Sequence, residues 1–200
     1  MLSYNESLKI LKETNALLEG HFVLSSGLHS NQYIQCAKLL SHPKQAAIIC
    51  ASLCENVKKK FTKIDVVLSP AIGGIVVGYE VGRQLGVKTI FAERVNGDLQ
   101  LRRGFEIQSN SNVLVVEDVI TTGKSALECL ELVNKNKANL LGYCCIIDRT
   151  NKESIIKDNI ISQIKLKIET YKNNELPEDL KKIQPIKPGS REFYKWKLKN

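Results

Sequence analysis

The sequence has no long apolar run, no paired-cysteine motif and few histidines. No stretch reaches the ~18 apolar residues that a membrane-spanning helix needs. The first residues, MLSYNESLKILKE, lack the charged and apolar regions of a secretory signal. We therefore expect a cytoplasmic protein without membrane contacts. The six cysteines form no CxxC pair, so we expect them to be reduced core residues rather than metal ligands.

Catalytic signatures built on a nucleophile are also missing. The three histidines, His21, His29 and His42, all lie early in the chain, away from the loops that follow the predicted strands. No Ser-His-Asp or Cys-His pattern is present. The sequence therefore predicts no covalent side-chain chemistry.

The composition is that of an ordinary globular protein. The chain has 200 residues, 43% hydrophobic and 25% charged, which suits one domain. The net charge of +8 is compatible with nucleic acids or with anionic small molecules. Lysines are spread along the chain and cluster only at residues 58–60. A lysine-rich surface or an anionic substrate is therefore favoured, and no nucleic-acid partner is expected.

Hydrophobic periodicity predicts strands that alternate with helices. A helix is expected over residues 3–19, opened by a Ser3–Glu6 capping box and stopped at Gly20. The other expected elements are a hairpin over 20–35, a helix from Pro43, a strand over 65–68, a helix over 74–85, a strand over 88–92, a hairpin turn at Asn96-Gly97 with a return over 99–103, a strand over 113–116, a helix over 124–135, a strand over 140–147, a further strand within 160–171 and an irregular segment over 175–192. Such alternation predicts an α/β fold with a parallel sheet.

In open parallel sheets, ligands bind beyond the carboxyl ends of the strands. Four loops are therefore of interest: SPAIGG (69–74), FAERVNGDLQLRRG (91–104), VEDVITTGKS (116–125) and IIDRT (146–150). Each follows a predicted strand, so their side chains should meet at one edge of the sheet.

The stretch VLVVEDVITTGKS combines a phosphate cradle with two acids. Residues 121–125 precede a helix, whose first N–H groups are unpaired and favour anions. This is not a Walker A loop, because Asp118 stands where that motif needs glycine. Glu117 and Asp118 are suited to accept hydrogen bonds from vicinal sugar hydroxyls, or to hold Mg²⁺. A ribose 5-phosphate satisfies both halves of the stretch.

The same stretch resembles the phosphoribosyl-diphosphate (PRPP) motif of type I phosphoribosyltransferases. GHFVLSSGLHSNQYIQ, FAERVNGDLQLRRGF, IIDRT and the terminal KPGSR resemble segments of orotate phosphoribosyltransferases, in their shorter subfamily. The similarity runs over about residues 1–191. It implies the type I phosphoribosyltransferase fold: a central, mostly parallel sheet flanked by helices, a small hood of N- and C-terminal segments, and a flexible β-hairpin loop. One domain would span 1–200, with the hood segment at 1–40 and the PRPP-binding core at 62–150.

The resemblance also implies a reaction. Orotate and PRPP give orotidine 5′-phosphate and diphosphate, with Mg²⁺, in the synthesis of UMP. It implies a homodimer, and it is compatible with a separate orotidine 5′-phosphate decarboxylase as a partner.

Site residues carry over by motif. PRPP would be bound by Glu117, Asp118, Val119, Ile120, Thr121, Thr122, Gly123, Lys124 and Ser125, and by Ala71, Ile72, Gly73 and Gly74 of the diphosphate loop, where the resemblance implies an unusual peptide bond at Ala71-Ile72. Orotate would meet Thr121, Arg149, Ser25 and Tyr33. Catalytic roles would fall to Glu117, Asp118, Arg94, Arg102 and Arg103, with Mg²⁺ held through PRPP and by Glu117 and Asp118.

Two departures and two alternatives remain. Longer relatives carry a lysine where Ser25 stands, and an essential lysine in the mobile loop, whereas residues 92–104 contain none. Three arginines of that loop are the available cations. A purine phosphoribosyltransferase is one alternative, although Arg149 favours a base that carries a carboxylate. A PRPP-binding regulator that binds nucleic acid is the other, kept open by the positive charge.

Overall fold

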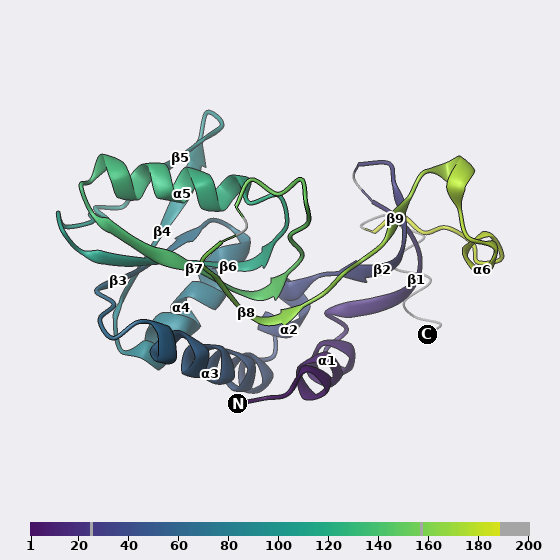
Figure 1. Cartoon of the computed structure of the whole chain (residues 1–200), viewed down its shortest axis with the longest axis horizontal. Coiled ribbons are helices and arrows are strands. Elements are labelled where there is room, and N and C mark those ends of the chain that lie inside the picture. Colours follow the sequence, from purple (N-terminus) through teal and green to yellow (C-terminus); the bar gives the residue numbers. More distant parts are fainter. Residues whose placement is uncertain (25, 157, 189–200) are drawn as a thin grey trace.

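The computed structural model describes residues 1–24, 26–156 and 158–188, and it contains two sheets (Figure 1). Ser25 and most of the KPGSR segment lie outside the described residues. The helices are α1 (Tyr4–Glu13), α2 (Cys36–Leu40), α3 (Pro43–Lys60), α4 (Gly73–Leu85), α5 (Lys124–Lys135) and α6 (Glu178–Lys181), with a 3₁₀ turn at Asn173–Glu175. The strands are β1 (Leu17–Val23), β2 (His29–Ile34), β3 (Val66–Pro70), β4 (Lys88–Val95), β5 (Asp98–Leu101), β6 (Asn112–Ile120), β7 (Asn139–Asp148), β8 (Ile160–Lys165) and β9 (Thr170–Tyr171).

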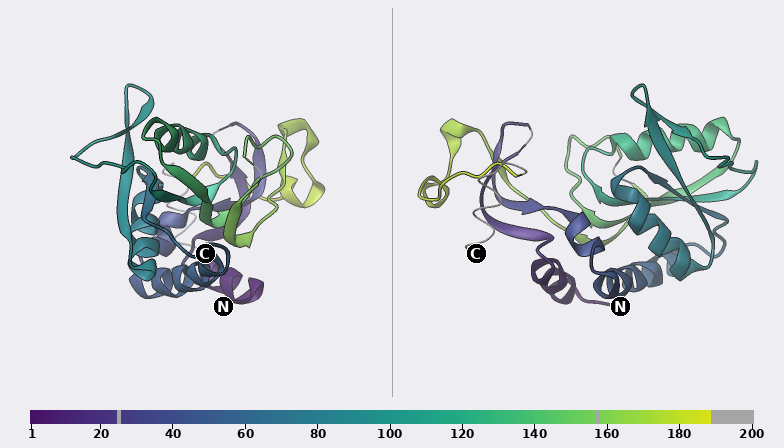
Figure 2. Two further views of the ribbon diagram at one scale, coloured as in Figure 1. Left: turned by 60° about the vertical axis from the view of Figure 1, so that its left-hand side comes forward. Right: turned by 180° about the vertical axis from the view of Figure 1, so that it is seen from behind.

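The larger sheet has the order β5-β4-β3-β6-β7-β8. All neighbours in it pair parallel except β4 and β5, which form an antiparallel hairpin. Helices α3 and α4 cover one face and α5 covers the other (Figures 1 and 2). The chain moves from β3 outward to β4 and then back to β6, so the strand order reverses between β3 and β6. The predicted α/β architecture is confirmed, and ligands of such sheets bind at this reversal.

The smaller sheet forms the hood, made of β1, β2 and β9 with α6 beside them (Figure 1). The hood is built from both ends of the chain. Ile186 lies along β1, where its N–H donates to the carbonyl of His21 (2.8 Å) and its carbonyl accepts from the N–H of Val23 (2.9 Å). His21 and His29 are hydrogen-bonded to each other inside the hood, away from the strand-end loops as expected.

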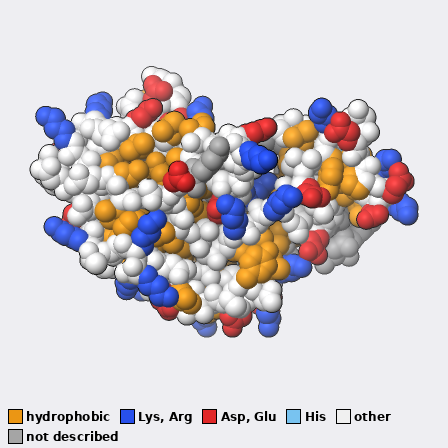
Figure 3. Space-filling model, in the orientation of Figure 1, with side chains coloured by type: hydrophobic (Ala, Val, Ile, Leu, Met, Phe, Trp, Pro, Cys, Tyr) orange, Lys and Arg blue, Asp and Glu red, His pale blue; other side chains and the backbone are white. Residues whose placement is uncertain are grey.

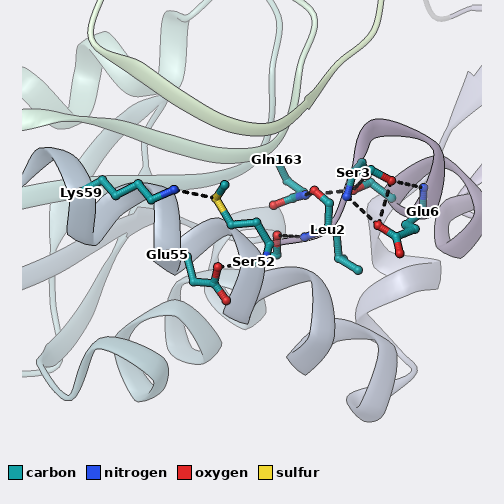
Figure 4. A network of polar contacts seen from close by, with 9 residues as sticks. Leu2, Ser3, Glu6, Ser52, Glu55, Lys59 and Gln163 are labelled. Atoms are coloured by element: carbon teal, nitrogen blue, oxygen red, sulfur yellow. Dashed lines mark hydrogen bonds and ion pairs between the residues drawn. The ribbon is translucent and has the colours of Figure 1, made fainter.

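The first helix is shorter than predicted. Its capping box is present, since the Ser3 hydroxyl accepts from the Glu6 N–H and Glu6 accepts from the Ser3 N–H (Figure 4). The helix ends at Glu13, because Asn15 takes a left-handed conformation (φ 54°) and the chain turns into β1. Gly20 lies inside that strand, so its prediction as a helix stop is wrong.

The N-terminal segment is bound to the core. The Leu2 N–H donates to the Ser52 hydroxyl of α3 (2.8 Å), and the terminal amine pairs with Glu55 (2.9 Å). Gln163 of β8 donates to the Ser7 hydroxyl of α1 (2.8 Å). Figure 4 shows that these contacts join α1, α3 and β8. This attachment holds α1, the helix that precedes the first hood strand, against α3 and β8.

Three further boundaries differ from expectation. β6 extends to Ile120, so Glu117 and Asp118 belong to the strand rather than to a loop. The return strand of the hairpin ends at Leu101, before Arg102 and Arg103. The segment 175–192, expected to be irregular, contains α6 within its described part.

All six cysteines are free and buried, as predicted. Over the described residues, no helix is both long and apolar enough to cross a membrane.

Candidate active site

The loop after β3 contacts the acid pair of β6. The peptide bond between Ala71 and Ile72 is cis, at the position where the resemblance implied an unusual one. Helix α4 then begins at Gly73. A Cβ atom at Gly73 would lie 3.1 Å from both carboxylate oxygens of Asp118. Glycine is therefore needed there, because a side chain would fill the space in front of the carboxylate.

Glu117 and Asp118 lie on opposite faces of β6, because consecutive strand residues alternate. Asp118 faces Gly73 at the start of α4, and its carboxylate accepts from the Val119 N–H (2.8 Å). Burial raises its pKa, and the hydrogen bonds from Val119 and from its own N–H oppose that rise. Glu117 lies towards α5, and no hydrogen bond opposes the rise of its pKa. Its Oε1 is buried and lacks a hydrogen-bond partner among the described residues.

Burial is also the main reason that the pKa of Glu117 rises to about 8, and the charges of Asp118 and Glu128 contribute less to that rise. A buried carboxyl without partners costs free energy when it ionises. Such a group is expected where a ligand supplies the missing partners. Glu117 Oε1 therefore has unused hydrogen-bonding capacity, whereas one oxygen of Asp118 already accepts from the Val119 N–H.

This arrangement predicts that the ligand-free protein becomes less stable as the pH rises. The folded-state pKa of Glu117 lies above its ordinary value, so its stabilising contribution is complete below pH about 4.5 and is lost as the pH rises to about 8. Glu117→Gln should remove that loss and stabilise the ligand-free protein by roughly 2–4 kcal/mol at pH 9. Chemical unfolding of both proteins from pH 5 to pH 9 measures this difference.

Glu131→Gln is the matched control, because Glu131 is exposed on α5. Its unfolding curve should follow that of the wild type at every pH. Equal pH dependence in Glu117→Gln and the wild type would contradict the assignment of the raised pKa to Glu117.

Residues 121–125 form a turn that leads into α5, as the sequence predicts. Gly123 has φ 81°, and a Cβ there would lie 2.1 Å from a side-chain carbon of Ile156. The Thr122 carbonyl accepts from the Ile155 N–H (2.8 Å), and the Thr121 carbonyl accepts from the Ser154 hydroxyl (2.6 Å). Two segments thus support the turn before α5. The first N–H of the helix, that of Lys124, donates to Thr122 Oγ1 at 3.4 Å, and a helix start of this kind favours anions.

Ser154 is a supporting residue that the sequence reasoning missed. It is 5% exposed and lies 33 residues from the threonine that it holds. No local pattern links a serine in the 151–156 loop to a turn after another strand. The contact becomes visible only once β6 and β7 are known to pair side by side.

Arg149 follows β7 directly and extends the ladder, since its N–H donates to the Ile120 carbonyl (2.8 Å). Its Nε is buried and has no hydrogen-bond partner among the described residues, and burial lowers its pKa. The neighbouring Asp148 does not pair with it. Asp148 instead accepts from the Thr150 N–H (2.7 Å) and pairs with Lys165 (2.9 Å). The Nε of Arg149 is therefore a buried donor that the described residues leave unsatisfied.

A cavity of about 520 Å³ lies between the hood and the core, and we call it the hood cavity. It is lined by Val23, Leu24, Ser26, Gln32, Tyr33, Ile34, Thr121, Thr122, Arg149, Lys187 and Pro188. Three of the four residues predicted to bind the base, Tyr33, Thr121 and Arg149, are thus brought together. Ser25, the fourth, lies outside the described residues, although its neighbours Leu24 and Ser26 line the cavity.

A second cavity of about 420 Å³ adjoins the hood cavity and shares Thr121, Thr122 and Arg149 with it. Lys152, Lys165 and Lys167 also line it. Figure 3 shows basic side chains gathered where the core meets the hood. One acid, Glu153, lines the second cavity beside these lysines and Arg149, so the charge of the lining is net positive, which suits anionic ligands.

The three loop arginines are held by acids in this structure. Arg94 of β4 makes a bidentate pair with Glu128 of α5, and Arg103 pairs with Glu93 (2.8 Å). Arg102 approaches Glu93 at 4.0 Å. Arg94 is close enough to Glu117 to oppose the rise of its pKa. None of the three is among the described residues that line the hood cavity. Their predicted ligand is the diphosphate rather than the base, and that role stays a prediction.

Comparison with known proteins agrees with this geometry. Residues 37–181 match the phosphoribosyl transferase domain family. The orotate phosphoribosyltransferase of Thermoanaerobacter sp. (strain X514) is 46% identical over 188 residues, covering 94% of this chain and 98% of its own. That of Maricaulis maris (strain MCS10) is 41% identical, covering 95% and 98%.

Solved structures share the fold. The orotate phosphoribosyltransferase from Aeropyrum pernix superposes with a TM-score of 0.68 at 25% identity, covering 80% of this chain and 93% of its own. An adenine phosphoribosyltransferase superposes with a TM-score of 0.65 at 19% identity, covering 81% and 100%, which shows the fold alone. The sheet reversal, the acid pair before a threonine turn and these matches lead to one conclusion: the chain belongs to the phosphoribosyltransferase family, among the orotate phosphoribosyltransferases.

Proposed function

We propose that this protein transfers the 5-phosphoribosyl group of PRPP to orotate, giving orotidine 5′-phosphate and diphosphate for the synthesis of UMP. The observation that carries the proposal is Arg149. Its buried, unpartnered Nε lies in a cavity that also reaches the threonine turn. An orotate carboxylate would supply the missing acceptor through a charge-assisted hydrogen bond.

The ribose 5-phosphate would lie across the end of β6. The phosphate would accept from the N–H groups at the start of α5, with the hydroxyls of Thr121, Thr122 and Ser125 and the ammonium of Lys124 beside it. Val119 and Ile120 would contribute backbone to this site. The ribose hydroxyls would donate to Glu117 and Asp118, which supplies the partners that Glu117 lacks in the ligand-free protein.

The diphosphate would bind at the loop after β3. Ala71, Ile72, Gly73 and Gly74 lie at the start of α4, where unpaired N–H groups favour anions. Arg94, Arg102 and Arg103 would reach it after release from Glu128 and Glu93. The arginine side chains of these pairs are exposed, although their carboxylate partners are only 20% exposed. Ion pairs with exposed partners contribute little to stability, so the arginines can exchange an acid for a diphosphate.

Mg²⁺ is the proposed cofactor. No group of three or more His, Cys, Asp or Glu residues suited to a metal occurs within 1–24, 26–156 and 158–188. The oxygen-rich pair Glu117 and Asp118, together with phosphate oxygens of PRPP, fits the preference of Mg²⁺ for few carboxylates and a phosphorylated substrate. When bound, the ion would neutralise charge on the departing diphosphate.

The reaction needs no side-chain nucleophile. The ring nitrogen of orotate forms the bond to ribose C1 and gives up its proton to solvent or to the departing diphosphate. The bond from C1 to the diphosphate oxygen breaks at the same time, and its electron pair leaves with diphosphate. The protein would hold the two reactants in line and stabilise the charges that develop. The proposed domain organisation follows: residues 1–40 supply part of the hood, 62–150 the PRPP-binding core, and 1–200 act as one unit.

Loss of orotate absorbance on addition of PRPP and Mg²⁺, with release of diphosphate, tests the proposal. Turnover that stops on chelation and returns with Mg²⁺ is expected. A protein that binds PRPP but turns over neither orotate nor another base would favour the nucleic-acid-binding regulator, whose DNA or RNA binding would fall steeply with salt. A separate decarboxylase partner stays a prediction.

A homodimer is also proposed, through α4. Val76 and Tyr79 of α4 are 50% and 65% exposed, and their spacing of three residues places them on one helix face. Tyr79→Glu should convert a dimer to a monomer, because a buried charge without a partner opposes association. Light scattering after gel filtration measures the mass.

Tyr4→Glu is the matched control, since Tyr4 is 52% exposed on α1, outside that face. It should leave the mass unchanged. A wild-type protein that is monomeric at micromolar concentration, or a dimeric Tyr79→Glu variant, would contradict the α4 interface.

A further inference from the structure

The C-terminal segment brings a basic side chain to the hood cavity. Ile186 is held against β1 by two backbone hydrogen bonds, to His21 and Val23, and its side chain is 6% exposed. This contact fixes the chain direction at the next residue. Lys187 and Pro188 accordingly line the hood cavity together with Val23 and Leu24 of the same edge.

The charges that line this cavity are of one sign. Arg149 comes from the core and Lys187 from the hood, and no Asp or Glu is among the described residues that line the cavity. The other polar groups there, including Tyr33, Gln32 and the two threonines, are neutral. A ligand between the two cations is therefore expected to be anionic, and at least part of its charge should lie away from the ribose phosphate.

We infer that Lys187 is a second specificity-determining cation of the base site, acting with Arg149 to select an anionic pyrimidine over a neutral one. This inference rests on the proposed function. Lys187 enters the cavity from the hood, whereas Thr121 and Thr122, beside which the ribose phosphate is placed, line it from the core. Its charge should therefore affect orotate more than PRPP.

The expected contribution is smaller than that of Arg149. Lys187 is exposed, whereas Arg149 is half-buried and follows the sheet directly. An ammonium acts as a hydrated point charge without the fixed fork of a guanidinium. Lys187→Ala should raise the KM for orotate about fivefold to tenfold at low salt, and the effect should shrink as salt screens the charge.

The experiment compares Lys187→Ala, Lys187→Arg and Lys182→Ala with the wild type. Lys182 is exposed at the end of α6 and is not among the residues that line the hood cavity. Expected results are a raised KM for orotate in Lys187→Ala, a KM for PRPP within about twofold of the wild type, near-complete recovery in Lys187→Arg and no change in Lys182→Ala. Thermal unfolding of each variant checks that it folds.

Three outcomes would overturn the inference: an unchanged KM for orotate in Lys187→Ala, a rise confined to the KM for PRPP, or no recovery in Lys187→Arg. Should Lys187→Ala fail to fold, Lys187→Gln is measured against Lys187→Arg under the same criteria. Failure of the proposed function is distinguishable, because the wild type itself would then not turn over orotate. A wild type that uses orotate beside an unaffected Lys187→Ala rejects only the role of Lys187.

Discussion

Asp118→Asn should lower the turnover of orotate roughly 100-fold or more, because an amide loses the charge that meets the ribose and the metal in the transition state. The carboxylate is fixed for this task. It accepts from the Val119 N–H and faces Gly73, whose missing side chain leaves space in front of it. Asparagine has the same shape and retains an oxygen for that hydrogen bond, so the fold should persist. Steady-state kinetics with saturating orotate and PRPP measure the effect.

Asp179→Asn is the control for this variant, since Asp179 is exposed on α6 in the hood. It should keep wild-type turnover. The burial of Asp118 raises its pKa, so the Asn variant should be at least as stable as the wild type to unfolding at neutral pH. A folded Asp118→Asn protein with near-normal turnover would remove the acid pair from the chemistry.

Arg149→Ala should raise the KM for orotate roughly 10- to 150-fold, the range expected for loss of a charge-assisted hydrogen bond, while the KM for PRPP changes little. Its buried Nε has no partner among the described residues, so the side chain is arranged for a ligand rather than for the fold. The variant should also discriminate less between orotate and uracil, because uracil has no carboxylate and so loses no contact when Arg149 is removed. The KM for orotate of Arg149→Lys should lie between those of the wild type and Arg149→Ala, since lysine keeps the charge without bidentate geometry.

The control variant Lys152→Ala distinguishes a direct contact between Arg149 and orotate from a general effect of positive charge near the cavity. Lys152 lies three residues from Arg149 and lines the adjoining cavity, but it is not among the residues that line the hood cavity. Its loss should leave the KM for orotate within about twofold. Two results would place Arg149 outside the base site. One is an equal increase of the KM for orotate and the KM for PRPP in Arg149→Ala, and the other is a KM for orotate in Lys152→Ala as high as that in Arg149→Ala.

Local patterns predicted the core of this site well. Two local signals were used: the apolar run before Glu117 and the glycine at position 123. They were combined with the rule that ligands bind beyond the ends of the strands. They located four strand-end loops that the sheet order then brought to one edge. The acid pair and the threonine turn were predictable because a single strand and its following helix contain both.

Other features depend on contacts between distant segments, and a sequence pattern does not contain them. Ser154 supports Thr121 across 33 residues, and Ile186 pairs with β1 across more than 160. The helix end was misplaced because Gly20 was the nearest familiar stop signal, whereas the turn is made by Asn15. The loop arginines were predicted for the diphosphate. Arg94 instead pairs with Glu128 of α5, 34 residues away, which no local pattern contains, whereas Arg103 pairs with Glu93 across the hairpin itself.

The most direct test of the central claim is a competition assay with the wild-type protein. Orotate, uracil, adenine, guanine and hypoxanthine are supplied together at equal concentration with PRPP and Mg²⁺, and the nucleotides formed are identified by mass. Orotidine 5′-phosphate should be the dominant product, because only orotate offers a carboxylate to Arg149. A purine nucleotide as the main product would retain the PRPP site and contradict the assignment of the hood cavity to orotate.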